Sequence, residues 1–152
     1  MSGLVPIAVF IDLYDPKTNS IEERFQNADP INTISFASPI FGTDVYKYLS
    51  FLYSGATQSK SGDNLEASLV LANTSTLRNG STTTNKLSMN YAHDAVDKGW
   101  NVHIHICKMN TAFTTVEDRI STDSWTVTSM GYDATNIEVM LSTGVDAVGG
   151  NI

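Results

Sequence analysis

Apolar and polar residues alternate along much of this chain, which is the period-two pattern of half-buried β-strands. Alternation predicts strands over residues 20–26, 65–72 and 100–109. Residues 5–14 are predicted to be a strand because they are rich in β-branched and aromatic residues, and two further strands are predicted over 124–130 and 136–142. The first two strands enclose the turn sequence Asp15-Pro-Lys-Thr-Asn19 and are predicted to form a hairpin. The last two flank a short turn at residues 132–135 and are predicted to form a meander. Glu23 is out of step, because it shares the apolar face of its strand with Ile21 and Phe25.

The remaining segments follow other patterns. Residues 84–97 place Leu87, Tyr91 and Ala95 at the i, i+4 and i+8 positions of an amphipathic helix, and Gly99 supplies a stop. The segment 46–53 is the most aromatic and is predicted to be a strand or a packed arm. Residues 27–39 are predicted to be irregular around Pro30 and Pro39, and 55–64 to be an exposed loop.

About seven short strands and one helix predict a mainly β fold, either an antiparallel β-sandwich or a small β-barrel with one short amphipathic helix. The length of 152 residues suits one domain, so residues 1–152 are predicted to form a single unit. The ends, about residues 1–4 and 147–152, are expected to be flexible because they have little to pack.

The net charge of the chain argues against two classes of binding partner, nucleic acids and anionic membranes. The chain has a formal net charge of −7, only 16% of its residues are charged, and no cluster of Lys or Arg occurs. Binding to nucleic acid or to an anionic membrane surface is therefore not expected. The apolar runs are too short to span a bilayer, and no basic secretory leader is visible. The single cysteine, Cys107, excludes an internal disulfide and fits synthesis in a reducing cytoplasm.

Two histidines are the first candidates for chemistry. His103 and His105 lie two residues apart on a predicted strand, so their rings leave the same face, as in a metal site or an acid–base pair. A metal would need a third ligand, for which Cys107, Asp94 and Glu117 are the candidates. The alternative is that both histidines are outward polar positions of a half-exposed strand. We therefore predict no bound metal and no cofactor.

Catalysis has no other support in the sequence. Cys107 would be a nucleophile only beside a base such as His105, and it is otherwise a small core or edge residue. No phosphate-binding, hydrolase or metalloprotease motif is present. We expect that the protein is not an enzyme.

The aromatic residues Tyr46, Tyr48, Phe51 and Tyr53 form a second candidate site. They are typical of a subunit contact, since aromatic residues are enriched at interfaces, or of a core. A sugar-binding platform is the other interpretation.

The order of several short motifs resembles one known family. These are Ile11-Asp-Leu-Tyr14, Arg24-Phe-Gln-Asn27, Phe51-Leu-Tyr-Ser-Gly55, Ser61-Gly-Asp-Asn-Leu65, Leu69-Val-Leu-Ala-Asn73, Gly99-Trp-Asn-Val-His-Ile-His105, Trp125-Thr-Val-Thr-Ser-Met-Gly-Tyr-Asp133 and Ile137-Glu-Val-Met-Leu-Ser-Thr-Gly-Val-Asp146. Together they span roughly the whole chain. In this order they resemble the tailed-phage family related to minor tail protein L of lambda-like siphophages, in its short single-domain form.

The resemblance implies a structural role in the virion. Such a protein would be made in the host cytoplasm and would form a trimeric or hexameric ring in the tail tip or baseplate hub. The ring would lie between the tail-tube end and the central hub or fibre proteins. Longer relatives carry a cysteine-rich domain with an iron–sulfur cluster, which one cysteine cannot supply. A carbohydrate-binding β-sandwich and a metal-dependent hydrolase are the alternatives from other classes.

Overall fold

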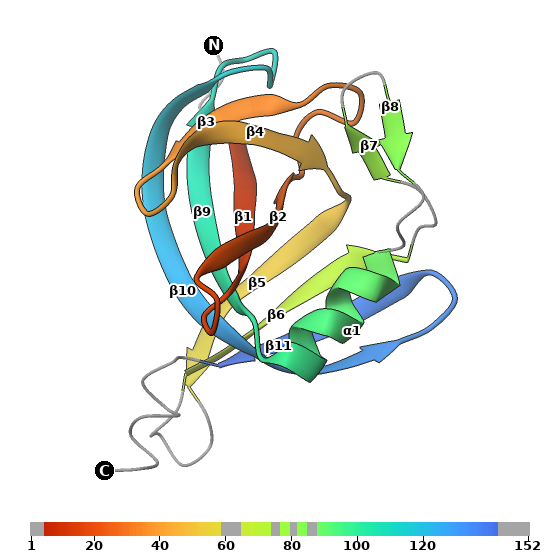
Figure 1. Cartoon of the computed structure of the whole chain (residues 1–152). Helices are drawn as coiled ribbons and strands as arrows, with labels where there is room; N and C mark the ends of the chain where they lie inside the picture. The colour runs from red at the N-terminus through yellow and green to blue at the C-terminus, as the bar shows by residue number, and fades with distance from the viewer. Residues whose placement is uncertain (1–4, 59–64, 74–76, 80–81, 85–87, 143–152) are drawn as a thin grey trace.

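Eleven strands and one helix make up the part of the chain that the computed structural model describes, which is residues 5–58, 65–73, 77–79, 82–84 and 88–142 (Figure 1). The prediction of a mainly β fold with one short helix is confirmed. The elements are β1 (Ile7–Asp15), β2 (Ser20–Gln26), β3 (Ile34–Ser38), β4 (Gly42–Tyr48), β5 (Phe51–Gln58), β6 (Leu65–Ala72), β7 (Leu77–Asn79), β8 (Thr82–Thr84), α1 (Ser88–Lys98), β9 (Asn101–Met109), β10 (Val116–Tyr132) and β11 (Asn136–Ser142).

The strands belong to one open sheet. Its order is β5-β6-β11-β10-β9-β1-β2-β4-β7-β8, and β3 pairs with β4 beside this path. Neighbouring strands are antiparallel except β2 and β4, which run parallel over a short stretch. The sheet is strongly curved, so that the β3–β4 hairpin crosses in front of β1 and β9 in Figure 1.

Most strands occur at the positions that the sequence predicts. The bounds of β2, β6 and β11 match the prediction, and β1 and β9 match it to within a few residues. The hairpin of β1 with β2 and the pairing of β10 with β11 are also confirmed. β10 is longer than the predicted strand 124–130, because it extends back to Val116 and pairs with β9 there.

Two predictions were wrong between residues 27 and 53. The segment 27–39 is not wholly irregular, because Ile34–Ser38 forms β3. The aromatic segment 46–53 is not one strand, because the chain changes direction at Leu49 and Ser50 between β4 and β5. The Leu49 amide donates to the Gln26 carbonyl at 3.0 Å, and the Ala72 amide donates to the Ser50 carbonyl at 2.9 Å. Pairing with distant strands therefore makes this bend, without a turn sequence.

The predicted loop 55–64 begins too early, since β5 continues to Gln58, and residues 59–64 lie outside the described part. The ends predicted to be flexible, 1–4 and 147–152, also lie outside it.

The helix starts later than predicted, at Ser88, because residues 82–84 belong to β8. It ends in a Schellman motif, in which the amide of Trp100 donates to the Ala95 carbonyl at 2.9 Å and that of Gly99 to Val96 at 3.4 Å. Gly99 adopts a φ of 65°, which favours glycine. Within the described residues, no helix has the length and apolar character needed to cross a membrane.

Strands β1 and β9 are buried on both faces, which gives the molecule two cores. The first core includes Ile11 and Val102 and is covered by one face of α1 through Tyr91 and Ala92. The second core lies between the opposite face of β1 and β9 and the β3–β4 hairpin, and it contains the apolar residues Ala8, Phe10, Ile34, Phe36, Tyr46, Cys107 and Met109. Polar side chains that point from β1 and β9 into the second core are therefore sealed from water.

Candidate functional site

A fully buried carboxylate lies at the second core. Alternation along β1 turns Phe10 and Asp12 toward the β3–β4 hairpin, while Ile11 and Leu13 face the first core. The Asp12 carboxylate accepts a hydrogen bond from the Tyr46 hydroxyl on β4. Its Oδ2 atom lies 2.8 Å from His105 Nε2 on β9 and accepts from Ser38 Oγ on β3 at 3.2 Å. One carboxylate therefore joins four strands.

The bonds continue from His105 toward the surface. His105 Nδ1 lies 2.8 Å from the hydroxyl oxygen of Thr122 on β10, and that oxygen accepts from Arg119 Nη1 at 3.0 Å. If the Nε2–H of a neutral ring donates to Asp12, Nδ1 accepts the Thr122 proton, so both ring nitrogens are satisfied. We call Asp12, Ser38, Tyr46, His105 and Thr122 the Asp12 cluster.

Two members of the cluster, Asp12 and Tyr46, have shifted pKa values. Burial alone would raise the pKa of Asp12, but the hydrogen bonds from His105, Tyr46 and Ser38 outweigh burial and hold this pKa below its ordinary value of 3.8. Burial raises the pKa of Tyr46, and the neighbouring Asp12 charge raises it further. Asp12 is thus ionised and Tyr46 protonated at neutral pH, which is the state that the observed bonds require.

His103 lies beside the cluster and was also expected to be half-exposed. Instead only 7% of its surface is exposed, because its ring stacks on Tyr14 at 5.0 Å and contacts Phe41 at 5.6 Å. Its Nδ1 atom is buried without a hydrogen-bond partner. Burial lowers the pKa of His103, as does the neighbouring His105, while the Asp12 charge opposes them. The outward position predicted for His103 and His105 is therefore wrong, because the β3–β4 hairpin covers this face.

The structure does not gather metal ligands around the two histidines. Glu117 forms an ion pair with Lys108 at 3.2 Å, and Asp94 lies on α1, which covers the opposite face of β9. Among the described residues, no three His, Cys, Asp or Glu side chains are placed to hold a metal ion. His105 uses both nitrogens within the Asp12 cluster.

Cys107 lies on the same face of β9 and is fully buried in the second core. Burial raises the pKa of its thiol to about 12, so the reactive thiolate is not populated at neutral pH. Since His105 bonds Asp12 and Thr122, it is not available as a base for this thiol.

The sequence Asp12–His105–Thr122 has the order of an acid, a base and a hydroxyl, as in hydrolases. Its carboxylate and ring are fully buried, and the Thr122 oxygen is already bonded by Arg119. The three hollows described below are lined by other residues. This geometry suits a structural cross-link between strands better than attack on a substrate.

The four aromatic interface candidates are spread over two strands. Tyr46 and Phe51 are buried in the second and first core, so the core alternative holds for them and a partner cannot reach their rings. Tyr53 is half-buried, and its hydroxyl donates to Asp123 at 2.8 Å and accepts from Trp125 Nε1 at 3.0 Å. Tyr48 is half-buried at the end of β4. Trp100 and Trp125 are also buried, so neither ring offers an open sugar platform.

The out-of-step residue Glu23 has a clear partner set. Lys47 on β4 pairs with its Oε2 atom at 3.0 Å, and the Tyr91 hydroxyl on α1 donates to the same atom at 2.7 Å. Burial raises the pKa of Tyr91, and the bond to Glu23 raises it further. This carboxylate ties β2, β4 and α1 at the rim of the first core.

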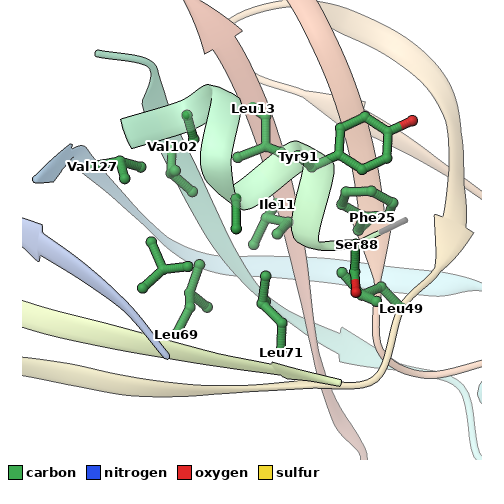
Figure 2. A pocket seen from close by; sticks show the side chains of 13 residues that line it. Ile11, Leu13, Phe25, Leu49, Leu69, Leu71, Ser88, Tyr91, Val102 and Val127 are labelled. Carbon is green, nitrogen blue, oxygen red and sulfur yellow. The ribbon is translucent and has the colours of Figure 1, made fainter. Parts of the chain in front are cut away.

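The first core encloses a small cavity beneath α1 (Figure 2). Its volume is about 20 Å³, and its lining includes Ile11, Phe25, Leu69 and Val102. A space of this size holds at most one water, and its walls are apolar, so it is a packing gap rather than a ligand site.

Two shallow hollows lie on the outer side of the sheet, away from α1. One, of about 170 Å³, is lined by Ser54, Gly55, Glu66, Ala67, Ser68 and Met140. The other, of about 410 Å³, is lined by Val70, Gly131, Tyr132, Asp133, Asn136 and Glu138. Neither hollow is lined by a residue of the Asp12 cluster.

Three of the five residues of the Asp12 cluster are not among the candidates that the sequence indicates. Ser38 lies in the segment predicted to be irregular, and Thr122 precedes the predicted strand 124–130. The available signal was Asp12 itself, a lone charge within the apolar run of residues 7–13. A charge in such a run must find buried partners.

Comparison with known proteins leaves the family open: no family model, no curated protein and no solved structure matches this chain.

Proposed function

We propose that this protein is a structural component of a phage tail tip or baseplate hub, which acts by binding neighbouring proteins. The observation that carries the proposal is that titratable side chains form bonds between elements inside the fold. Asp12 and His105 are fully buried and bonded to other strands, and Glu23 is bonded to Lys47 and Tyr91. They stabilise a scaffold and leave the outer surface for contacts.

The motif order along the chain supports the same proposal, since it resembles the minor tail protein family. In that setting the protein forms a trimeric or hexameric ring between the tail-tube end and the central hub or fibre proteins. Closed rings suit the rotational symmetry of a tail.

A search for this chain by mass spectrometry in purified phage particles tests the proposal. We expect peptides of the chain at a stoichiometry of one ring per particle, retained after the particles are washed in high salt. Absence from intact particles that contain the other tail proteins would overturn the proposal. Particles with tails removed serve as the matched control, and they should lack the chain.

A further inference from the structure

We propose that the β3–β4 hairpin is an acid-sensitive lid over the second core, which lifts when His103 takes up a proton. The lid is residues 34–48, that is β3, β4 and the turn between them. This property belongs to the fold itself, so it is independent of the proposed function. It is carried by the attachment of the lid at one end, the ring contacts at its tip and the burial of the His103 ring.

The lid is attached to the rest of the sheet at one end. Within the described residues β3 pairs only with β4, and β4 pairs with β2 and β7 only through Lys47 and Tyr48. The hairpin crosses in front of β1 and β9 without pairing with them (Figure 1). The tip of the lid, residues 39–41, is therefore held against the sheet through side chains.

The contact at the tip is aromatic and includes His103. The Phe41 ring lies 5.2 Å from that of Tyr14 on β1 and 5.6 Å from that of His103 on β9. Only 7% of His103 is exposed, and its Nδ1 atom has no hydrogen-bond partner among the described residues. A protonated imidazole carries two N–H donors. A charge on this ring would therefore bury a donor that has no acceptor, which is unfavourable.

The nearest anion does not supply that acceptor. Asp12 lies opposite His103 in the pairing of β1 with β9, yet its carboxylate bonds Ser38, Tyr46 and His105 instead. The Asp12 charge does favour a proton on His103, but burial and the neighbouring His105 outweigh it and lower the pKa of His103.

The charged groups of the other elements at this face bond to partners of their own. β10 places the uncharged Ser124 opposite His103, and its Arg119 donates to the hydroxyl that also bonds His105. β2 places Arg24 beside Asp12, and the Arg24 guanidinium pairs with Asp44 of the lid at 3.0 Å. A proton on His103 thus adds a second cation to a face that already contains the Arg24 guanidinium.

Lifting of the lid removes this cost, because water then reaches both ring nitrogens and His103 regains its ordinary pKa of 6.5. Between 6.5 and the lower pKa of the closed state, the open state binds more protons. Acid therefore favours opening, by up to about ten-fold per pH unit for one proton. The bonds of Ser38 and Tyr46 to Asp12 keep the lid closed at neutral pH. Asp12 has a pKa below 3.8, so it stays ionised in this range.

An open lid exposes apolar surface that is covered at neutral pH. Its inner face carries Ile34 and Phe36, which belong with Phe10 and Cys107 to the second core. The first core lies on the opposite face of β1 and β9, beneath α1, so it stays packed when the lid lifts. Mild acid thus presents an apolar face on an otherwise folded chain.

The test measures how fast the single cysteine becomes accessible. Cys107 is fully buried in the second core, and its thiol is labelled with dithiodipyridine, a disulfide that reacts in mild acid. The labelling rate is divided by that of the same chain unfolded in guanidinium at each pH, so the ratio reports the open population. We expect this ratio to rise about three- to thirty-fold from pH 7.5 to 5. Urea should raise it much less steeply than it raises the unfolded population, because a lifted lid exposes less surface.

Variants assign the effect to His103 and to the tip. His103→Phe keeps an aromatic ring without a titratable proton, so its labelling ratio is expected to stay constant from pH 7.5 to 5. His93→Gln is the matched control, since His93 is exposed on α1, and it should retain the full rise. Phe41→Ala removes the ring contact and is expected to raise the ratio at pH 7.5 at least about five-fold. Ile40→Ala, at a residue that is 48% exposed, should leave it unchanged.

An NMR titration of the His103 ring in the unaltered chain keeps the inference testable if His103→Phe does not fold. A His103 pKa at or above 6.5 would overturn it. So would a constant labelling ratio in the unaltered chain, a full rise in His103→Phe, or a urea dependence equal to that of global unfolding. Each result concerns the purified chain, so it leaves the presence of the protein in phage particles, tested separately, unaffected.

Discussion

A carboxylate in an apolar core is stable only when hydrogen bonds replace the water that it loses. Asp12 receives three such bonds, from Ser38, Tyr46 and His105, each on a different strand. Unlike surface charges, whose pairs contribute little, this residue contributes to stability through every partner that its removal would leave unsatisfied.

Replacement of Asp12 by alanine is predicted to lower the free energy of unfolding by about 3–5 kcal/mol, because it leaves three buried donors without an acceptor. Guanidinium denaturation at pH 7 measures the change. Asp44→Ala is the control, since Asp44 is 47% exposed and pairs with Arg24 at 3.0 Å, and its loss should stay below about 1 kcal/mol. A loss of the same size in both variants would contradict this role of Asp12.

Acid is predicted to destabilise the fold in two stages. The pKa of His103 is lower in the folded chain than its ordinary value of 6.5, which applies to the unfolded chain. Between 6.5 and the lower folded pKa, the unfolded chain binds more protons, so stability falls as pH decreases. The pKa of Asp12 lies below 3.8, so its contribution is present above that value and is lost as pH falls through the folded pKa. His103→Phe should flatten the first stage, measured as unfolding free energy from pH 7.5 to 5. An unchanged slope in this variant would exclude His103 as the cause.

The sequence predicts only part of this cluster. Alternation along β9 correctly places His103 and His105 on one face, since strand geometry is local. It does not reveal that a hairpin formed by β3 and β4 covers them, because that depends on contacts across the chain. A polar residue in a strand is consistent both with exposure to solvent and with burial under another element.

Among the elements, the end of α1 is encoded by the local sequence, whereas the bend between β4 and β5 depends on pairing with distant strands. The stop of α1 at Gly99 was readable from sequence, because only glycine adopts a φ of 65° without strain. The bend at Leu49 and Ser50 was not, since its bonds run to Gln26 and Ala72 in other elements. The aromatic residues of 46–53 therefore do not indicate that β4 ends and β5 begins within this segment.

Gly99→Ala is predicted to lower the free energy of unfolding by about 1–2 kcal/mol, the cost of the left-handed conformation for a residue with a Cβ atom. Gly131→Ala is the matched variant, because Gly131 lacks a positive φ and a Cβ there meets no atom within 4 Å. It should be neutral or slightly stabilising. Thermal unfolding of the two variants distinguishes them, and equal melting temperatures would contradict the assignment.

Tyr53 links β5 to β10, since its hydroxyl bonds both Asp123 and Trp125. Tyr53→Phe is predicted to cost about 1 kcal/mol and to change the Trp125 emission, because the indole N–H loses its acceptor. Tyr132→Phe, at a ring that is 71% exposed, is the control and should change neither. Urea denaturation followed by fluorescence measures both effects, and an unaltered spectrum in Tyr53→Phe would argue against the link.

Across the whole molecule, two long strand pairings join segments that are distant in sequence. β1 pairs with β9, and β6 pairs with β11. Such topologies fold slowly, because the entropy of closing long loops is lost before the stabilising contacts between distant strands form. Refolding followed by stopped-flow fluorescence is predicted to take milliseconds to seconds, and completion within about 100 μs would be inconsistent with this topology.

β10 serves both cores. Its first part pairs with β9, and Val116 there packs against the second core; its later part pairs with β11, and Val127 there belongs to the first core. A cut in the sequence that separates the two cores would therefore have to pass through β10. A chimera that exchanges one core would have to keep the whole of β10, so we expect the two cores to be exchangeable only as one module.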